Sequence, residues 1–322
     1  MAHRVEPESA HLTLAAPLSV PLFELLNAAY GRLEAAGVDS PRLSADLLAC
    51  RVLSLDRVGL FLNKNKRLAP AQVVTFRGLV ARRAAGEPVA YLLGEKEFYG
   101  LEFKVTPDVL IPRPETEHLV EQALALFPRD AELRYADCGT GSGCLAVTLA
   151  TLYAHCRALA VDTSPAALAV ARINAQLHGV GARVLFVQAD FSALPCADGA
   201  LDLVLANPPY VSTAEYLALS REVRDFEPQS ALVPTLALQI RRQSTGLESF
   251  AAVMAAAARA LRPAGVLLLE IGCTQAAAVR ALCAETPGER AGPRPGSALW
   301  STVRILPDLA GLDRVAVFTR SL

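Results

Sequence analysis

Asn207-Pro208-Pro209-Tyr210 is the stretch of this chain whose residue types could do chemistry most directly. Two consecutive prolines are incompatible with a continuing helix or strand ladder, so they hold Asn207 and the Pro208 carbonyl in place. An Asn oxygen and a fixed carbonyl can accept both hydrogens of a planar amino or amide nitrogen, and Tyr210 can cover its flat face. We therefore predict that Asn207, Pro208 and Tyr210 are catalytic and that Pro209 joins them in binding the substrate. A simple turn is the alternative that Asn-Pro usually indicates.

A second candidate is the glycine-rich stretch that runs from Asp137 to Gly143, between an expected strand and an expected helix. Glycines allow a sharp turn and a close approach of the backbone to a ligand, and the following helix N-terminus offers free N–H groups. The spacing G-x-G-x-G matches neither the P-loop nor the dinucleotide fingerprint. We predict a cofactor-binding loop formed by Gly139, Thr140, Gly141, Ser142 and Gly143. A tight turn without a ligand is the alternative.

Acidic residues follow the next two expected strands. Asp162 lies about twenty residues past the glycines, where an acid can accept hydrogen bonds from a ribose diol; capping of the helix that begins at Pro165 is the alternative. Asp190 can accept from an adenine amino group and Phe191 can stack on the ring, unless they are a polar loop start and a core residue. Three successive strands are thus each followed by residues that suit one part of a nucleoside, which predicts a cofactor that contains a nucleoside. We expect this cofactor to lie close enough to Asn207 for Asn207 to contact it too.

These residues need a scaffold that brings strand ends together. From Leu133 onward, short apolar strands alternate with Ala-rich helices, which predicts an α/β fold with a doubly wound, largely parallel sheet. The expected strands are 133–137, 158–161, 184–188, 201–206, 266–271, 302–306 and 315–319, and the expected helices are 144–152, 165–178 and 249–261. Ligands bind outside the carboxyl ends of the strands in such a sheet.

The part of the chain before this sheet has a different pattern. Apolar residues recur at helical spacing from Leu22 to Leu33, and a second helix is expected from Pro41. The chain is thus predicted to comprise a flexible N-terminus (1–19), a small helical bundle (20–86), a connector (87–118) and the sheet domain (119–322). Within the connector, residues 97–99 and 101–105 are expected to form a hairpin.

Residues 57–86 of the bundle contain seven cations and no acidic residue. The cations are Arg57, Lys64, Lys66, Arg67, Arg77, Arg82 and Arg83. Such a run is usually a solvated helix face, and the alternative is a surface that attracts an acidic partner.

The composition of the chain excludes several classes of protein. Its 322 residues carry 31 Lys+Arg against 32 Asp+Glu and are 52% hydrophobic, which predicts a globular chain with a sizeable core. The net charge of -1 disfavours nucleic acid as a partner, and no apolar run is long enough to span a membrane. The first residues resemble neither a signal nor a transit peptide, so we expect a cytoplasmic protein. Seven cysteines without C-x-x-C spacing predict reduced side chains and no metal site.

Together these motifs resemble the AdoMet-dependent methyltransferases, and specifically the HemK/PrmC family of peptide-chain release factor glutamine N5-methyltransferases. The resemblance covers about Glu87 to the C-terminus. It is carried by Glu97-Phe98-Tyr99-Gly100-Leu101, Ile111-Pro112-Arg113-Pro114-Glu115-Thr116-Glu117, the Asp137 to Gly143 loop, Asn207-Pro208-Pro209-Tyr210, Glu227-Pro228 and Asp308-Leu309-Ala310-Gly311. Asn-Pro-Pro-Tyr is shared with adenine-N6 methyltransferases, and the Ile-Pro-Arg-Pro-Glu-Thr-Glu stretch makes the resemblance specific.

The resemblance implies a seven-stranded class I methyltransferase-like sheet with S-adenosyl-L-methionine (AdoMet) as cofactor. The methyl group would pass to the side-chain amide N5 of the glutamine in the GGQ loop of a peptide chain release factor, which would tune translation termination. No base strong enough to deprotonate an amide is visible, so the site must act by orientation, which can contribute on the order of 7 kcal/mol. We expect the bundle to recognise the release factor, and a monomer that binds neither nucleic acid nor membrane.

Other interpretations remain open at this point. A methyltransferase acting on a nucleic-acid base needs the same Asn-Pro-Pro-Tyr geometry around a flipped base. A catalytically silent AdoMet-fold binding protein is suggested by Val233 to Thr245, which stands where the family usually has a Gly-Gly-x-Asp-Gly-Leu turn. Arg113 and Glu117 are candidates either for catalysis or for an ion pair and a helix N-terminal charge. His118, His155 and His178 are expected to be structural.

Overall fold

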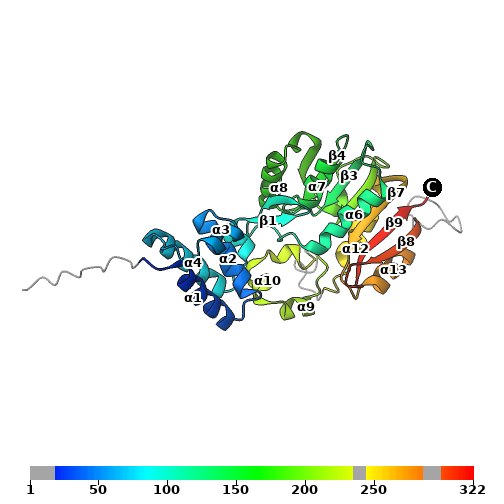
Figure 1. Cartoon of the computed structure of the whole chain (residues 1–322). Helices are drawn as coiled ribbons and strands as arrows, with labels where there is room; N and C mark the ends of the chain where they lie inside the picture. Colours follow the sequence, from blue (N-terminus) through cyan, green and yellow to red (C-terminus); the bar gives the residue numbers. More distant parts are fainter. Residues whose placement is uncertain (1–18, 235–243, 286–298) are drawn as a thin grey trace, which may run out of the picture. The chain divides into compact units, whose positions relative to one another are not determined.

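The computed structural model describes residues 19–234, 244–285 and 299–322 (Figure 1). The chain forms two compact units, Met1–Leu92 and Leu93–Leu322, whose boundary falls inside the predicted connector. The predicted flexible terminus 1–19, apart from Ser19, and most of the unusual segment after Leu232 lie outside the described residues.

Helices make up the described part of the first unit, as their apolar spacing predicts. They are α1 (Leu22–Ala35), α2 (Pro41–Leu53), α3 (Arg57–Leu62), α4 (Pro70–Ala84) and the short α5 (Val89–Leu93) at the boundary. The residues of α1 that share one face, Leu22, Leu25, Leu26, Ala29 and Leu33, are all buried. Pro41 is the first residue of α2, a position that tolerates proline because no helical hydrogen bond needs its nitrogen.

A two-stranded hairpin opens the second unit, close to where the sequence predicts one. Strands β1 (Glu95–Phe98) and β2 (Leu101–Lys104) pair antiparallel, with Phe98 opposite Leu101. Tyr99 and Gly100 form the turn at positive φ values of 51° and 76°, as the favoured two-residue hairpin turns require.

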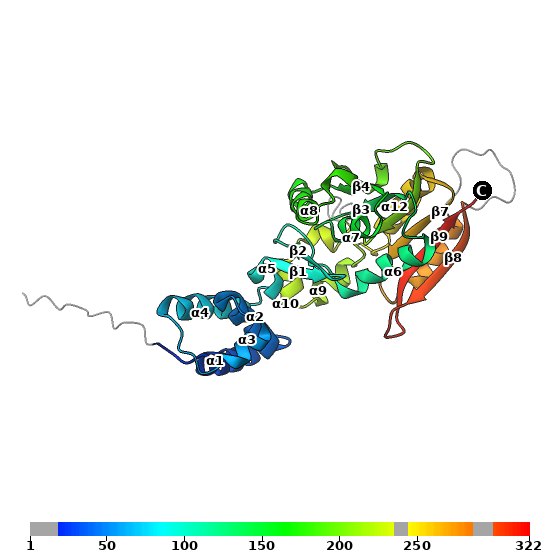
Figure 2. The ribbon, with the colours of Figure 1, turned by 45° about the horizontal axis from the view of Figure 1, so that its top comes forward.

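The second unit is built on a seven-stranded sheet, which confirms the predicted architecture (Figure 2). Its strands are β3 (Arg134–Cys138), β4 (Arg157–Asp162), β5 (Val184–Gln188), β6 (Leu201–Ala206), β7 (Leu261–Glu270), β8 (Trp300–Pro307) and β9 (Asp313–Arg320). They lie in the order β5-β4-β3-β6-β7-β9-β8, parallel from β5 to β7, with β9 antiparallel to both of its neighbours. Strand β7 begins five residues before the predicted start at Val266 because its residues 262–264 are exposed and carry no apolar signal.

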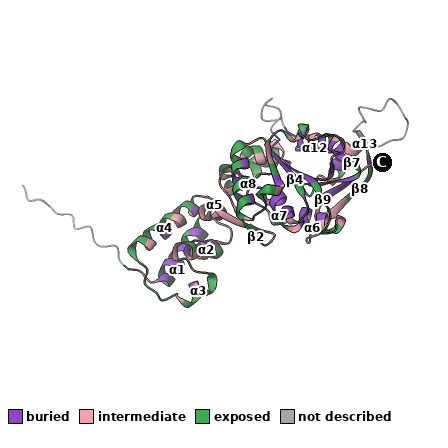
Figure 3. Cartoon of the chain, turned by 90° about the horizontal axis from the view of Figure 1, so that it is seen from above, coloured by how far each residue is buried: buried purple, intermediate pink, exposed green. Residues whose placement is uncertain are grey.

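Helices cover both faces of this sheet (Figure 3). Side chains from α6 (Glu117–Leu126), α7 (Cys144–Leu152) and α8 (Pro165–Leu177) form one core cluster with Leu203 and Leu205 of β6. The alternate residues Val204 and Ala206 face the cluster that contains α12 (Glu248–Ala260) and residues of α13 (Ala276–Glu285). The two-residue period of a strand thus divides β6 between two cores.

Short helices complete the described part of the second unit. They are α9 (Thr213–Ala218) and α10 (Arg221–Phe226), together with 3-10 turns at Pro114–Thr116, Gly181–Arg183, Phe191–Ala193 and Gln229–Ala231. None of the described helices has the length and apolar character of a membrane span. The seven cysteines, all within the described residues, form no disulfide.

Candidate active site

The site lies where the order of the strands reverses. Strand β3 is flanked by β4 and β6, and its last residue, Cys138, is in register with Val161 on one side and Ala206 on the other. Gly139 and Asn207 are the next residues along the chain, so they leave the sheet at the same edge. Such a switch point is the usual ligand site of an open parallel sheet.

A cavity of 260 Å³ opens at this edge and brings together most of the predicted site residues. Seven of them line it: Gly139, Gly141, Asp162, Asp190, Phe191, Asn207 and Pro209. Thr140, Ser142, Gly143, Pro208 and Tyr210 are not among its lining residues. Several lining residues gave no signal in the sequence, including Asp108, Thr163, Ser164, Ser230 and Glu248.

The three loop glycines have two different roles. Gly139 and Gly141 have φ values of 76° and 54°, and a Cβ atom built on either would meet nothing within 4 Å. Their backbone therefore faces open space, as a loop that must lie close to a ligand requires. A Cβ on Gly143 would instead lie 3.1 Å from the Ala171 Cβ, so this glycine allows α7 to pack on α8.

Thr140 and Ser142 hold the shape of the loop from behind. The Thr140 hydroxyl donates to Asp137 Oδ2 over 2.7 Å, and the Ser142 carbonyl accepts a hydrogen bond from Asn174 Nδ2 over 2.8 Å. Both residues are buried. The contact of Thr140 and Ser142 with a cofactor stays a prediction. Their support of the loop follows from the hydrogen bonds described above.

Asp162 supports the same loop from the neighbouring strand. Its two carboxylate oxygens accept hydrogen bonds from the Gly141 and Ser164 N–H groups, each over 2.9 Å. Ser164, and not Asp162, caps helix α8, so the capping alternative for this aspartate is wrong. Burial raises the pKa of Asp162, and the backbone hydrogen bonds oppose that shift.

Asp190 and Phe191 also line the cavity. Their contacts equally fit the alternative that they are a polar loop start and a core residue. Asp190 is exposed and accepts a hydrogen bond from the Ser192 N–H over 2.8 Å, which is the polar loop start that its position allows. Phe191 is half-buried and packs against the core. The contacts of both with adenine stay predictions.

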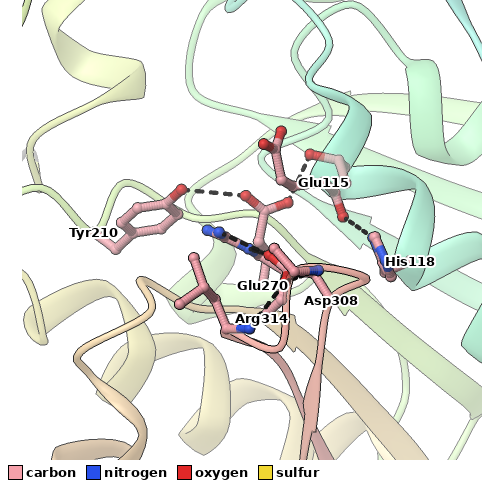
Figure 4. Close-up of polar contacts among 9 residues, drawn as sticks. Glu115, His118, Tyr210, Glu270, Asp308 and Arg314 are labelled. Carbon is pink, nitrogen blue, oxygen red and sulfur yellow. Dashed lines mark hydrogen bonds and ion pairs between the residues drawn. The ribbon is translucent and has the colours of Figure 1, made fainter.

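Asn207 and Tyr210 are held by the same buried acid. Asn207 Nδ2 donates to Thr116 Oγ1 over 3.0 Å, and Thr116 donates to Glu270 Oε2 over 2.6 Å. The Tyr210 hydroxyl donates to Glu270 Oε1 over 3.2 Å (Figure 4). The Tyr210 ring stacks on Phe250 with 6.4 Å between centroids, which accounts for its absence from the cavity wall. In this structure Tyr210 therefore supports the site and does not cover the cavity.

Arg113 and Glu117 take the structural alternatives that the sequence left open. The Arg113 guanidinium pairs with Glu227 Oε1 at 2.5 Å, and the other Glu227 oxygen accepts from the Ile111 N–H. Glu117 lies in the first turn of α6, and its carboxylate accepts a hydrogen bond from the Tyr99 N–H. These contacts join the Ile-Pro-Arg-Pro-Glu-Thr-Glu stretch to the loop after α10 and to the hairpin.

Sequence reasoning missed three buried polar residues: Asp137, Thr116 and Glu270. Glu270 ends an apolar strand and Asp137 is the last residue but one of another, much the same signal that identified Asp162, so they could have been found. Burial raises the pKa of Glu270, and its hydrogen bonds with Thr116 and Tyr210 oppose the shift. Thr116 gave no such signal, because only the fold brings it to the sheet edge.

Asp137 should make stability depend on pH. Burial raises its pKa from 3.8 to about 6, although Thr140 and Ala146 donate to its carboxylate. The folded chain then holds a proton that the unfolded chain has lost, so stability falls as pH rises through 6. Relative to Asp137→Asn, the free energy of unfolding of the wild type should drop by about 1 kcal/mol from about pH 5 to about pH 7.

Urea unfolding of both proteins without cofactor measures this difference. Parallel pH profiles of the wild type and Asp137→Asn would show that the carboxylate keeps its ordinary pKa in the folded chain.

The cavity suits a nucleoside-bearing cofactor. Open backbone at Gly139 and Gly141 leaves room beside the loop, and the carboxylates of Asp162 and Asp190 can accept from hydroxyl and amino groups. No cluster of His, Cys, Asp and Glu side chains placed to bind a metal ion occurs in the described ranges.

Comparisons with known proteins found matching family models, relatives and solved structures. A family model described as the PrmC N-terminal domain matches residues 24–94, and one described as a methyltransferase domain matches residues 129–299. A release factor glutamine methyltransferase from Nitratidesulfovibrio vulgaris is 50% identical over 298 residues, covering 92% of this chain and 95% of the relative. One from Moorella thermoacetica is 42% identical and covers 91% and 96%. A solved methyltransferase structure from Pyrococcus furiosus is 15% identical with a TM-score of 0.48, covering 75% and 98%.

Proposed function

The chain belongs to the family of release factor glutamine methyltransferases, and on this premise we propose how its cavity performs the reaction. The protein is an AdoMet-dependent enzyme that methylates the side-chain amide of a glutamine in a release factor. AdoMet supplies the methyl group, which it carries on a positively charged sulfur. The residues of the chain bind and orient the two reactants.

One observation carries this proposal above the others. Asn207 follows Ala206, and the glycine loop follows Cys138, which is in register with Ala206. Asn207 and the glycine loop line the same cavity. A cavity walled by open loop backbone on one side and an amide oxygen on the other can hold a cofactor and an N–H-bearing acceptor together. Asn207 Oδ1 and the Pro208 carbonyl would each accept one hydrogen of the glutamine amide.

The titratable residues of the described cavity lining support a mechanism of orientation. They are Asp108, Asp162, Asp190 and Glu248, all carboxylates that already accept hydrogen bonds from backbone N–H or hydroxyl groups. A carboxylate is far too weak a base to deprotonate a neutral amide. Holding the nitrogen in place can still contribute on the order of 7 kcal/mol to lowering the barrier. Methyl transfer leaves the nitrogen positively charged, and it then loses one proton to solvent water.

Incubation with labelled AdoMet and a purified release factor tests the function. The label should enter the release factor and be absent from a matched release factor whose GGQ glutamine is replaced by alanine. Cofactor binding in calorimetry without transfer would favour the silent binding protein. Transfer to nucleic acid in place of the release factor would favour a base methyltransferase.

We also propose that the first unit recognises the release factor through its basic stretch. Two of the seven cations have internal roles: Arg82 pairs with Glu87 at 2.5 Å, and the buried Arg83 donates to the Glu87 carbonyl. The sequence expectation of seven cations without a local counter-charge is therefore wrong for Arg82. Arg57, Lys64, Lys66, Arg67 and Arg77 remain exposed.

Exposed apolar side chains beside these cations support the same proposal. Phe61 and Leu62 of α3 are 70% and 74% exposed, and Lys64 lies over the Phe61 ring at 5.5 Å. Apolar side chains ringed by charge are typical of protein-binding surfaces.

Reversing the charge of Lys64, Lys66 and Arg67 to Glu should raise the KM for the intact release factor about 3- to 10-fold at low salt. Surface cations speed the encounter with an acidic partner, and salt screens this effect. A short Gly-Gly-Gln peptide, which lacks the rest of the release factor, should keep its KM. The matched triple Gln variant should show a smaller rise, and equal kinetics on the intact release factor would make this stretch a solvated face.

The setting of the reaction completes the proposal. A substrate that works in translation supports a cytoplasmic enzyme, and the near-neutral charge supports action on a protein without nucleic acid or membrane. We propose that a single chain is the active form.

A further inference from the structure

A line of hydrogen bonds runs from Asn207 into the interior of the second unit. Asn207 Nδ2 donates to Thr116 Oγ1, which donates to Glu270 Oε2. Thr116 and Glu270 are only 3% and 2% exposed. Solvent water is thus poorly placed to replace either partner, and each depends on the other to satisfy its hydrogen bonds.

Glu270 accepts hydrogen bonds on both of its oxygens. Thr116 donates to one and Tyr210 to the other. Burial raises the pKa of Glu270, and the positive charge of Arg314, which pairs with Asp308 at 3.2 Å, opposes that shift and favours the ionised form. Figure 4 shows Tyr210, Arg314 and Asp308 around this carboxylate. The two hydrogen bonds donated to Glu270 and the nearby Arg314 cation are what an ionised carboxylate requires, since it can accept hydrogen bonds but cannot donate one.

The number of hydrogens along this line decides which way the Asn207 amide faces. A threonine hydroxyl has one hydrogen, and Thr116 gives it to Glu270. The Thr116 oxygen can then only accept from Asn207, so it must meet the NH₂ group and not the carbonyl oxygen. This leaves Asn207 Oδ1, to which no described residue donates a hydrogen bond, for a ligand in the cavity that Asn207 lines.

We propose that Thr116 and Glu270 are positioning residues that orient the Asn207 amide and thereby select a carboxamide over a carboxylate as the acceptor group. The inference rests on the proposed function, in which Asn207 holds the glutamine amide. A flipped Asn207 would present N–H hydrogens, which suit the side chain of glutamate and oppose the hydrogens of glutamine. Groups that must hydrogen-bond in a buried site discriminate strongly between such isosteres.

Binding of two peptides that differ only in Gly-Gly-Gln or Gly-Gly-Glu tests the orientation without turnover. With the full chain and S-adenosylhomocysteine, the wild type should bind the glutamine peptide at least about tenfold more tightly. In Glu270→Gln, an amide N–H can donate to Thr116, whose hydroxyl can then donate to Asn207. The preference should fall to about threefold or less, and kcat on the release factor should fall about tenfold.

Thr116→Val and Thr116→Ser are the matched pair for this test. Valine keeps the shape of threonine and removes the hydroxyl, so it should lose the preference as Glu270→Gln does. Serine keeps the hydroxyl and should stay within about twofold of the wild type. If Glu270→Gln does not fold, the comparison of valine with serine decides alone.

An unchanged glutamine preference in Thr116→Val would overturn the proposal, as would equal losses in the valine and serine variants. The AdoMet Kd should stay within about threefold of the wild type in every variant, because none of these residues lines the glycine loop. A wild type that does not methylate the release factor would contradict the proposed function alone, since the peptide preference needs no methyl transfer.

Discussion

Asn207→Ala should remove most of the activity and leave cofactor binding nearly intact. We expect kcat on the release factor to fall by about 100-fold or more, the usual cost of losing one preorganised hydrogen-bonding group at a reacting centre. The Kd for AdoMet should change by less than about threefold, because Asn207 holds mainly the acceptor, and the glycine loop and Asp162 supply most of the predicted cofactor contacts. Steady-state kinetics and calorimetry on the same preparation measure both quantities.

Asn207→Asp is the matched control for this result. Aspartate keeps the shape and an acceptor oxygen but cannot donate to Thr116 Oγ1, so it should also be strongly impaired. Survival of kcat within a factor of about three in Asn207→Ala, under about 1 kcal/mol of barrier, would mean that another residue holds the acceptor.

Asp162→Ala should weaken AdoMet binding by about 1 to 3 kcal/mol, or about 5- to 150-fold in Kd. The change removes the acceptor of the Gly141 and Ser164 N–H groups and the carboxylate that is predicted to bind the ribose hydroxyls. Calorimetric titration with AdoMet measures the loss. Unchanged affinity would rule out both the support of the loop and the contact with the ribose.

A cofactor analogue without the ribose 2′-hydroxyl separates the two effects of Asp162. If Asp162 accepts from that hydroxyl, the analogue should bind the wild type more weakly than AdoMet does, and Asp162→Ala should bind both alike. If the aspartate only shapes the loop, the analogue should lose the same affinity in both proteins. Asp190→Ala is a useful comparison, because its carboxylate is exposed and bonded to Ser192, so its effect should be smaller.

Much of the fold and part of the site could be predicted because their signals are local. A strand or helix is recognisable from the period of its apolar residues, and helix α7 and strands β5 and β6 have the predicted bounds. Parallel strands end at one edge of a sheet, so the motifs at those ends had to lie near each other. Where exposed residues interrupt the apolar period, as in Arg262–Ala264, the prediction was wrong.

What the sequence by itself determined is therefore the order of the elements and which motifs share the edge of the sheet. Only the tertiary structure decided how those motifs are supported, because the supporting contacts join residues far apart in the chain. Asn207 and Thr116 are 91 positions apart, and Thr116 and Glu270 are 154 apart. No local propensity encodes such pairs; close packing of the sheet, α6 and the loops brings them within hydrogen-bond distance. The same packing directs the Tyr210 hydroxyl toward Glu270 and places Gly143 where α7 packs against α8.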